Sequence, residues 1–150
     1  MIGLLQRVSR ADVTVDGDII AEIGAGLLVL IGVERGDTEA QAARLLERLL
    51  AYRVFADPQG RMNLSVADAG GSLLLVPQFT LAADTGKGNR PGFSRAADPA
   101  RGRELYDRMV RLAEASGVPV ASGRFGARMR VNLSNEGPVT FWLQVAPGVE

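Results

Sequence analysis

A two-residue turn near the start of the chain limits the possible folds more than any other feature. Residues 3–15 (GLLQRVSRADVTV) alternate between apolar and polar side chains, and a second apolar run, IIAEIG, follows Asp16-Gly17 at residues 19–24. Asp-Gly is a favoured pair for the turn of a β-hairpin, because both of its positions need a positive φ. The sequence therefore predicts an antiparallel hairpin at this end of the chain.

Two apolar runs further along the chain predict strands inside a sheet. Residues 26–33 (GLLVLIGV) are continuously apolar, which is typical of a strand that is buried on both faces. Residues 70–82 (GGSLLLVPQFTLA) form a similar run, in which Pro77 is expected to bend or demote the strand because proline cannot donate to the ladder. Between these runs, residues 52–66 predict a strand, a turn and a second strand.

Two amphipathic segments predict helices. Thr38 stands three residues before Gln41, as in a capping box, and the apolar residues that follow recur at helical spacing until the helix ends near Arg53. Residues 83–102 are rich in Gly, Pro and polar side chains and predict a long loop, at the end of which Asp98 caps a second helix.

The C-terminal part of the chain predicts three more strands, at residues 118–122, 127–134 and 139–145. Gly137 and Pro138 separate the last two strands, and two interpretations of them are open. One is a hairpin turn, since Gly accepts a positive φ and Pro fixes φ near its turn value. The other is that the Gly-Pro peptide presents its backbone to a ligand, since Gly permits close approach and Pro has ready access to a cis bond.

Together these elements predict a single α+β domain over residues 1–150, with two main helices and a mainly antiparallel sheet that curls toward a barrel. No run reaches the roughly 18 apolar residues that a membrane span needs, and the first residues lack the apolar core of a signal peptide. We therefore expect a soluble, cytoplasmic protein with no membrane partner.

The composition excludes several kinds of chemistry. The chain has no Cys and no His, so it offers no disulfide, thiolate nucleophile, Ser-His triad or imidazole metal ligand, and we expect neither a metal nor a cofactor. Acid-base groups must then be carboxylates, Arg, Lys, Tyr, hydroxyls, backbone dipoles or groups of the substrate. Residues 87–130 carry 10 Lys and Arg against 4 Asp and Glu, which indicates either phosphate contact or a solvated face.

Five segments of the chain, in this order, resemble the D-aminoacyl-tRNA deacylases over essentially the whole length. They are LQRVSRADVTVDG (5–17), PQFTL (77–81), ADTGKGNRPGFS (83–94), FGARM (125–129) and NEGPVT (135–140).

The resemblance implies hydrolysis of the ester that joins a D-amino acid, or glycine mischarged on tRNA-Ala, to the 3′ end of a tRNA. It also implies a homodimer in which the Gly137-Pro138 peptide, in the cis form, reaches into the partner's pocket. In the family, Ser usually precedes the Gln-Phe-Thr-Leu segment, and here Pro77 stands in its place. The resemblance therefore assigns Gln78, Phe79 and Thr80 to the catalytic site without a hydroxyl at position 77.

The chemistry of the implied substrate suits a protein without His or Cys. The ribose 2′-OH lies beside the scissile ester, so the substrate can bring its own acid-base group. A backbone N–H, of Phe79 or Thr80, is the candidate to stabilise the oxyanion. The carbonyls of Gly137 and Pro138 can hold the α-ammonium group so that an L side chain clashes with the wall, whereas glycine has no side chain to reject.

The three catalytic candidates have structural alternatives. Three interpretations of Thr80 are open. It is a nucleophile, which would need a base, or its hydroxyl positions water or the ester, or it is an ordinary strand residue. Phe79 is by default a core aromatic, of which only the N–H acts. Gln78 is either a satisfied polar group or a binder of the ribose or adenine.

The binding candidates also have alternatives. Arg7 is a surface cation or holds the Gly-Pro loop through its carbonyls, and Met129 is a pocket wall or a core residue. Lys87, Arg90 and Arg95 contact the phosphates of the tRNA acceptor stem or form a solvated face.

Two other functions compete with the deacylase. A module that binds nucleotides or tRNA 3′ ends without catalysis is favoured only by the missing Ser at position 77. A hydrolase of small D-amino acid esters would make no use of the basic loop.

Overall fold

The predicted N-terminal hairpin is confirmed. In the computed structural model, which describes residues 1–148, β1 (Ile2–Val15) pairs antiparallel with β2 (Asp18–Ile23). Asp16 and Gly17 join the two strands with φ values of 51° and 84°. The turn therefore uses the conformation that the Asp-Gly pair favours.

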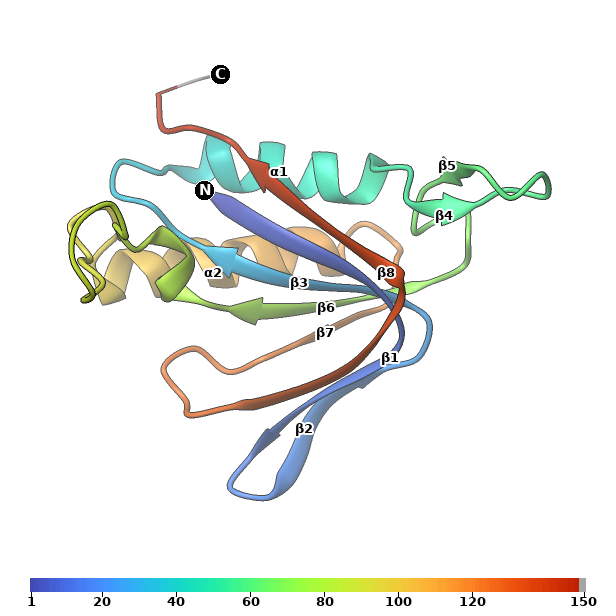
Figure 1. The fold of residues 1–150 in the computed structure, drawn as a ribbon, viewed down its shortest axis with the longest axis horizontal. Helices are drawn as coiled ribbons and strands as arrows, with labels where there is room; N and C mark the ends of the chain where they lie inside the picture. Colours follow the sequence, from blue (N-terminus) through green and yellow to red (C-terminus); the bar gives the residue numbers. More distant parts are fainter. Residues whose placement is uncertain (149–150) are drawn as a thin grey trace.

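Strand β1 is paired along both of its edges and lies at the centre of the sheet (Figure 1). On one edge its first half pairs with β3 (Gly26–Gly32) and its second half with β2, both antiparallel. On the other edge β8 (Arg130–Gln144) runs antiparallel along almost the whole of β1. The N-terminal strand thus fixes the register of three other strands.

The sheet continues from β3 through parallel pairs with β6 (Ser72–Pro77) and then β7 (Val120–Ser122). It is therefore mixed, although its longest pairings are antiparallel. Strand β2, at one end of the strand order, also contacts β6 and β7, so the sheet curls back on itself. This arrangement confirms the predicted α+β fold with a sheet curled toward a barrel.

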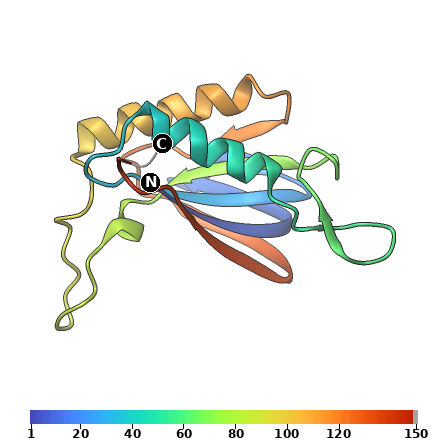
Figure 2. The same ribbon diagram turned by 90° about the horizontal axis from the view of Figure 1, so that it is seen from above.

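Both helices cover the same face of the sheet (Figure 2). Helix α1 (Glu39–Ala51) begins with the predicted capping box, and α2 (Pro99–Glu114) begins after Asp98, whose carboxylate accepts from the Arg101 N–H. Their apolar stripes pack on the sheet in the main core. That core includes Leu5, Leu27, Leu45, Leu49, Leu73, Leu105 and Met109. Among residues 1–148 no helix is long and apolar enough to cross a membrane.

Two short elements differ from the sequence prediction. The strands predicted within residues 52–66 shrink to β4 (Phe55–Ala56) and β5 (Met62–Leu64), which pair with each other in a separate sheet. The apolar run 70–82 is not one strand, because β6 ends at Pro77 and residues after Gln78 form the 3₁₀ turn η1 (Phe79–Ala82). Proline lacks the N–H that would continue the ladder.

The C-terminal strands are one element rather than two, so the hairpin interpretation of Gly137-Pro138 is wrong. Gln6 pairs with Thr140 and Val8 pairs with Asn135, so residues 136–139 of β8 stand opposite Arg7 alone. The chain keeps its direction through this bulge. Its Gly137-Pro138 peptide is cis.

A buried ion pair joins three segments beside the core. The Met1 ammonium donates to Asp37 Oδ1 at 2.9 Å and to the Val145 carbonyl at 2.6 Å, and both ionic side groups are fully buried. Glu34 adds a second carboxylate at 3.5 Å. Burial raises the pKa of Asp37, while the hydrogen bond from the ammonium opposes that shift. The pair links the start of β1 to the β3–α1 connection and the end of β8.

We expect the Asp37→Asn variant to lose about 3 kcal/mol of unfolding free energy, because removing one partner of a buried ion pair leaves a charge without full compensation. Urea unfolding at neutral pH measures this loss. Asp18→Asn, which removes an exposed carboxylate from β2, is the matched control and should change stability by less than about 0.5 kcal/mol. Equal stability of the two variants would show that the pair makes no net contribution.

Candidate active site

A cavity of about 450 Å³ opens where the carboxyl ends of β3 and β6 meet the start of α2. Its walls are mostly apolar and include Ile31, Val76, Tyr106 and Phe125. Parallel strands β3 and β6 end together here, so the loops that follow them surround the opening. The cavity has the size and character of a site for a small organic group.

The polar side of the cavity is formed by the start of η1. The Gln78 N–H donates to the Ile31 carbonyl at 2.8 Å, which fixes η1 to the end of β3. The Thr80 hydroxyl donates to Gln78 Oε1 at 2.6 Å. Because the first N–H groups of a helical turn have no acceptor within it, those of Phe79 and Thr80 are available to a ligand.

Close packing against β3 sets the position of η1. A Cβ on Gly32 would lie 2.9 Å from Leu81 Cβ and 3.3 Å from the Gln78 carbonyl oxygen. Only glycine leaves room for the turn to lie this near the strand. The absence of a side chain at position 32 therefore determines where Gln78 and Phe79 face the cavity.

The opposite wall is formed by Met129, Phe125 and Tyr106. A Cβ on Gly123 would lie 3.0 Å from the Met129 sulfur, so the sulfur packs closely against the backbone of the β7–β8 connection. The Tyr106 hydroxyl lies 2.9 Å from the carbonyls of both Leu75 and Gly123. Burial raises the pKa of the Tyr106 phenol, which therefore stays neutral and acts as a structural tie.

The sequence alone does not place Tyr106 or Phe125 at the site. Tyr106 lies within the predicted second helix, and Phe125 belongs to the FGARM segment. No local pattern shows that they meet Gln78. The only available signal was the resemblance of FGARM to a family motif that also contains Met129.

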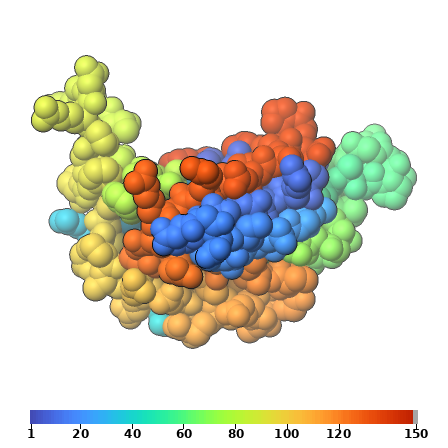
Figure 3. Space-filling model, turned by 90° about the horizontal axis from the view of Figure 1, so that it is seen from below, coloured from blue at the N-terminus to red at the C-terminus, as the bar shows by residue number. Residues whose placement is uncertain are grey.

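Phe79 is not a core aromatic, since its side chain is 60% exposed. Its ring lies 5.2 Å from that of Phe93, which belongs to the long loop between η1 and α2. The same loop carries Lys87, Arg90 and Arg95 at the surface. In the space-filling view of Figure 3 this loop stands out from one end of the molecule and the β4–β5 hairpin from the other.

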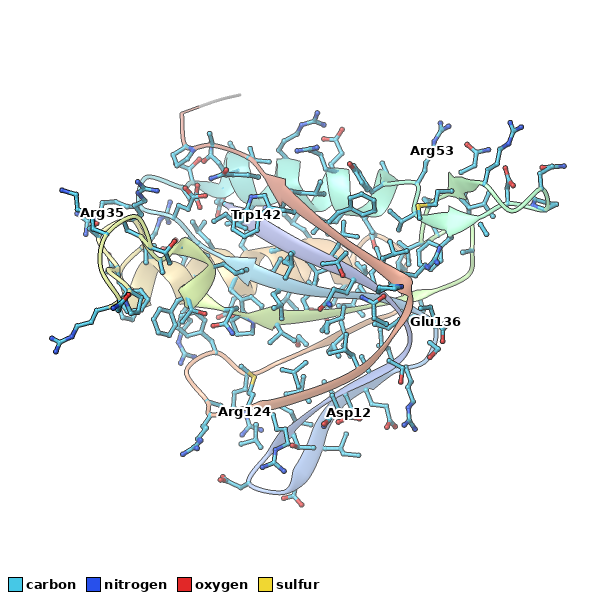
Figure 4. The ribbon with its side chains drawn as sticks, viewed as in Figure 1. Asp12, Arg35, Arg53, Arg124, Glu136 and Trp142 are labelled. Atoms are coloured by element: carbon cyan, nitrogen blue, oxygen red, sulfur yellow. The ribbon has the colours of Figure 1, made fainter. Side chains whose placement is uncertain are left out.

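The Gly137-Pro138 bulge lies at the other end of the sheet from this loop. Figure 4 labels Glu136, beside the bulge, at one end and Arg35, whose N–H donates to the Arg95 carbonyl of the loop, at the other. Arg7 holds the bulge: its Nε donates to the Glu136 carbonyl at 3.0 Å and its Nη1 to the Val54 carbonyl at 2.7 Å. Gly137 and Pro138 are exposed.

Within one chain the bulge and η1 are well separated. The bulge is level with Arg7, which pairs with Leu27, and Leu27 pairs with Leu73. Gln78 is five residues beyond Leu73, which corresponds to about 16 Å along the strand. Strands β1 and β3 lie between β8 and β6, which adds about 14 Å across the sheet. A single chain therefore does not bring the two motifs into one site.

The outer edge of β8 pairs with no other strand among residues 1–148. Three of its large apolar side chains are exposed: Leu133, Phe141 and Trp142, the last at 51% (Figure 4). An unpaired edge with apolar side chains is suited to association with another chain.

No group of three or more acidic residues within residues 1–148 has the arrangement of a metal site. The site offers backbone N–H groups, an amide, a hydroxyl and apolar walls. These groups can bind, orient and polarise a substrate, but they include no strong base.

Comparisons with known proteins give one consistent result. A family model described as D-Tyr-tRNA(Tyr) deacylase matches residues 4–144. A D-aminoacyl-tRNA deacylase of Thioalkalivibrio sulfidiphilus is 65% identical, covering 98% of this chain and 99% of its own. A second protein of that name, from Nitrosococcus oceani, is 60% identical and covers 100% of this chain and 97% of its own.

Two solved structures share the fold over almost the full length. The c-Myc DNA unwinding element binding protein superposes with a TM-score of 0.93 at 36% identity, covering 97% of this chain and 99% of its own. A probable eukaryotic D-amino acid tRNA deacylase superposes with a TM-score of 0.80 at 20% identity, covering 96% of this chain and 98% of its own. The second likeness concerns the fold alone.

We expect the Gly32→Ala variant to displace η1 and to lose about 1–3 kcal/mol of unfolding free energy, because the added methyl group overlaps Leu81. Chemical denaturation measures the loss, and amide exchange of residues 78–82 reports the displacement. Gly24→Ala is the control, since its Cβ would meet nothing within 4 Å. Unchanged exchange of residues 78–82 in the Gly32→Ala variant would contradict this role for Gly32.

Proposed function

The chain belongs to the D-Tyr-tRNA(Tyr) deacylase family and is a hydrolase of ester bonds, and we propose that its cavity receives the 3′ end of a tRNA charged with a D-amino acid. The main support for the proposal is that Gln78 and the first N–H groups of η1 border an apolar cavity. Residues 1–150 form one deacylase domain in this proposal.

The catalytic groups are mainly backbone groups. Water adds to the ester carbonyl carbon, the bond from that carbon to the ribose oxygen breaks, and the ribose oxygen takes up the proton. The N–H of Phe79 or Thr80 stabilises the oxyanion, and the neighbouring ribose hydroxyl assists proton transfer. Gln78 binds the ribose or adenine, and Met129 contributes to the wall of the pocket.

Thr80 positions the reacting groups and does not attack the ester itself. Its hydroxyl donates to the amide oxygen of Gln78, which is not a base that could take its proton. No His is present to take that role. This contact supports the positioning role over the nucleophilic one.

A homodimer completes the site. The distance between η1 and Gly137-Pro138 in one chain supports a partner that supplies its own Gly-Pro bulge to the cavity. In that position the carbonyls of Gly137 and Pro138 accept hydrogen bonds from the α-ammonium group, and the wall excludes an L side chain. Arg7 holds the bulge in place. Glycine passes this test, so glycyl-tRNA-Ala is a second substrate.

The loop that carries Lys87, Arg90 and Arg95 contacts the phosphates of the acceptor stem. Its position beside η1, through the Phe79–Phe93 contact, supports this role. We place the reaction in the cytoplasm, where aminoacyl-tRNA is used.

The protein should release the amino acid from D-Tyr-tRNA and leave L-Tyr-tRNA intact, because only the L side chain meets the wall. Release of labelled tyrosine over time measures both reactions. Binding without release would favour a non-catalytic module that binds tRNA 3′ ends. Release from simple D-tyrosine esters at a rate that does not depend on salt would favour a small-ester hydrolase.

Two defective chains should restore activity when they form mixed dimers. Arg7→Ala loosens the bulge and Gly32→Ala displaces η1, so each homodimer has two damaged sites. A mixed dimer has one site in which both parts are intact. We expect the mixture, after joint refolding, to recover about a quarter of wild-type activity from random pairing, as judged by D-Tyr-tRNA deacylation.

Arg7→Ala mixed with Arg7→Ala serves as the control for refolding and should stay inactive. Activity in the mixture no higher than the sum of the two homodimers would contradict a site shared between chains.

A further inference from the structure

A second hollow lies on the far side of the wall of the active-site cavity. It has a volume of about 290 Å³ and is lined by α2 and the residues that follow β7. Tyr106 and Phe125 line both this hollow and the cavity, so the two spaces are separated by little more than these aromatic rings. A ligand chain that leaves the cavity past Phe125 would reach the hollow next.

The hollow is strongly cationic. Arg103 and Arg111 line it from α2, two helical turns apart. Arg124, which is labelled in Figure 4, extends from the β7–β8 connection. Asp107 is the only carboxylate in the lining, so the three guanidinium groups leave an excess of positive charge. All three Arg side chains belong to exposed residues.

Unlike the other two arginines of α2, Arg103 and Arg111 have no carboxylate partner among the described residues, and Arg124 has none either. On the same helix Arg101 pairs with Glu104 at 2.9 Å, and Arg108 lies 3.9 Å from Glu39. Within residues 1–148, Arg103, Arg111 and Arg124 form no ion pair within 4.0 Å. No carboxylate of the described residues therefore neutralises their charges.

Arg103 is already held in a defined position. Its guanidinium lies 5.2 Å from the centre of the Phe125 ring and donates to the Phe125 carbonyl at 3.3 Å. An Arg fixed on an aromatic ring loses little side-chain freedom when it binds an anion. Guanidinium groups also match the geometry of phosphate oxygens.

We propose that this hollow binds the backbone phosphates of the single-stranded 3′ end of the tRNA, immediately before the terminal nucleotide in the cavity. The inference rests on the proposed function, because it takes the cavity as the site of that nucleotide. Cationic grooves beside aromatic rings are a common means of binding single-stranded nucleic acid. The hollow therefore orients the approaching strand, and the residues at η1 act on the ester.

The test uses a double variant, Arg111→Ala with Arg124→Ala, and two substrates. One is D-Tyr-tRNA, and the other is 3′-O-D-tyrosyl-adenosine, which has no phosphate. For the tRNA we expect KM to rise about tenfold with kcat unchanged. The slope of log KM against the logarithm of the salt concentration should fall by about 1.4, because two phosphate contacts are lost. For the adenosine ester, neither kcat nor KM should change.

The control variant, Arg44→Ala with Arg61→Ala, removes the same charge from α1 and from the β4–β5 hairpin. It should keep the wild-type KM and salt dependence. The inference is wrong if the Arg111/Arg124 variant keeps the wild-type KM for tRNA, or if it loses activity equally on the adenosine ester. Wild-type protein that cleaves neither D-substrate would refute the proposed function instead.

A binding experiment identifies the ligand directly. The probes are an RNA hexamer that ends in CCA and the same hexamer with uncharged methylphosphonate linkages before its last two nucleotides. Wild-type protein should bind the natural hexamer about tenfold more tightly, and the double variant should bind both equally. Equal binding by wild-type protein would show that the hollow does not recognise phosphate.

Discussion

The pairing of β1 along both of its edges is the constraint on which the rest of the structure depends. On one edge it fixes β3, and through the parallel β3–β6 pair it determines where η1 begins. On the other edge it fixes β8 and the place of the Gly-Pro bulge. A single strand thus sets the positions of two motifs that lie far apart in the sequence and at opposite ends of the sheet.

This separation suits chemistry that relies on backbone groups. Peptide N–H and carbonyl groups are useful to a reaction only when they are held rigidly, because they cannot be tuned as a side chain can. In the proposed site, a 3₁₀ turn packed on Gly32 supplies donors, and a bulge tied to Arg7 supplies acceptors. Placing them on separate elements lets each be fixed by its own packing, and association of two chains in the proposed homodimer would bring them together.

Local signals in the sequence predicted the local structure. The turn at Asp16 and Gly17 and the cap at Thr38 depend on neighbouring residues, and both are confirmed. The continuity of β8 through Pro138 could not be predicted, since it results from pairing with β1, more than a hundred residues away. Tyr106 reaches the site for a similar reason, because only the packing of α2 on the sheet places it there. The resemblance to a family assigned residues to the site, but their spatial separation is visible only in the fold.

The bulge in β8 has a consequence for how this fold can diverge. Four residues stand opposite Arg7, and a second irregularity in the pairing follows between Val8 and Arg10, so the ladder continues beyond the bulge in a shifted register. The Asn135 side chain closes the bulge through the N–H and carbonyl of Val139, and Arg7 of β1 holds it through the Glu136 carbonyl. The exposed Glu136 side chain can be substituted without changing the flanking ladder, whereas a Cβ on Gly137 would lie 2.7 Å from Val139 Cγ2. The exposed groups that β8 presents at this point can therefore vary separately from the pairing that maintains the fold, within a stretch of four residues.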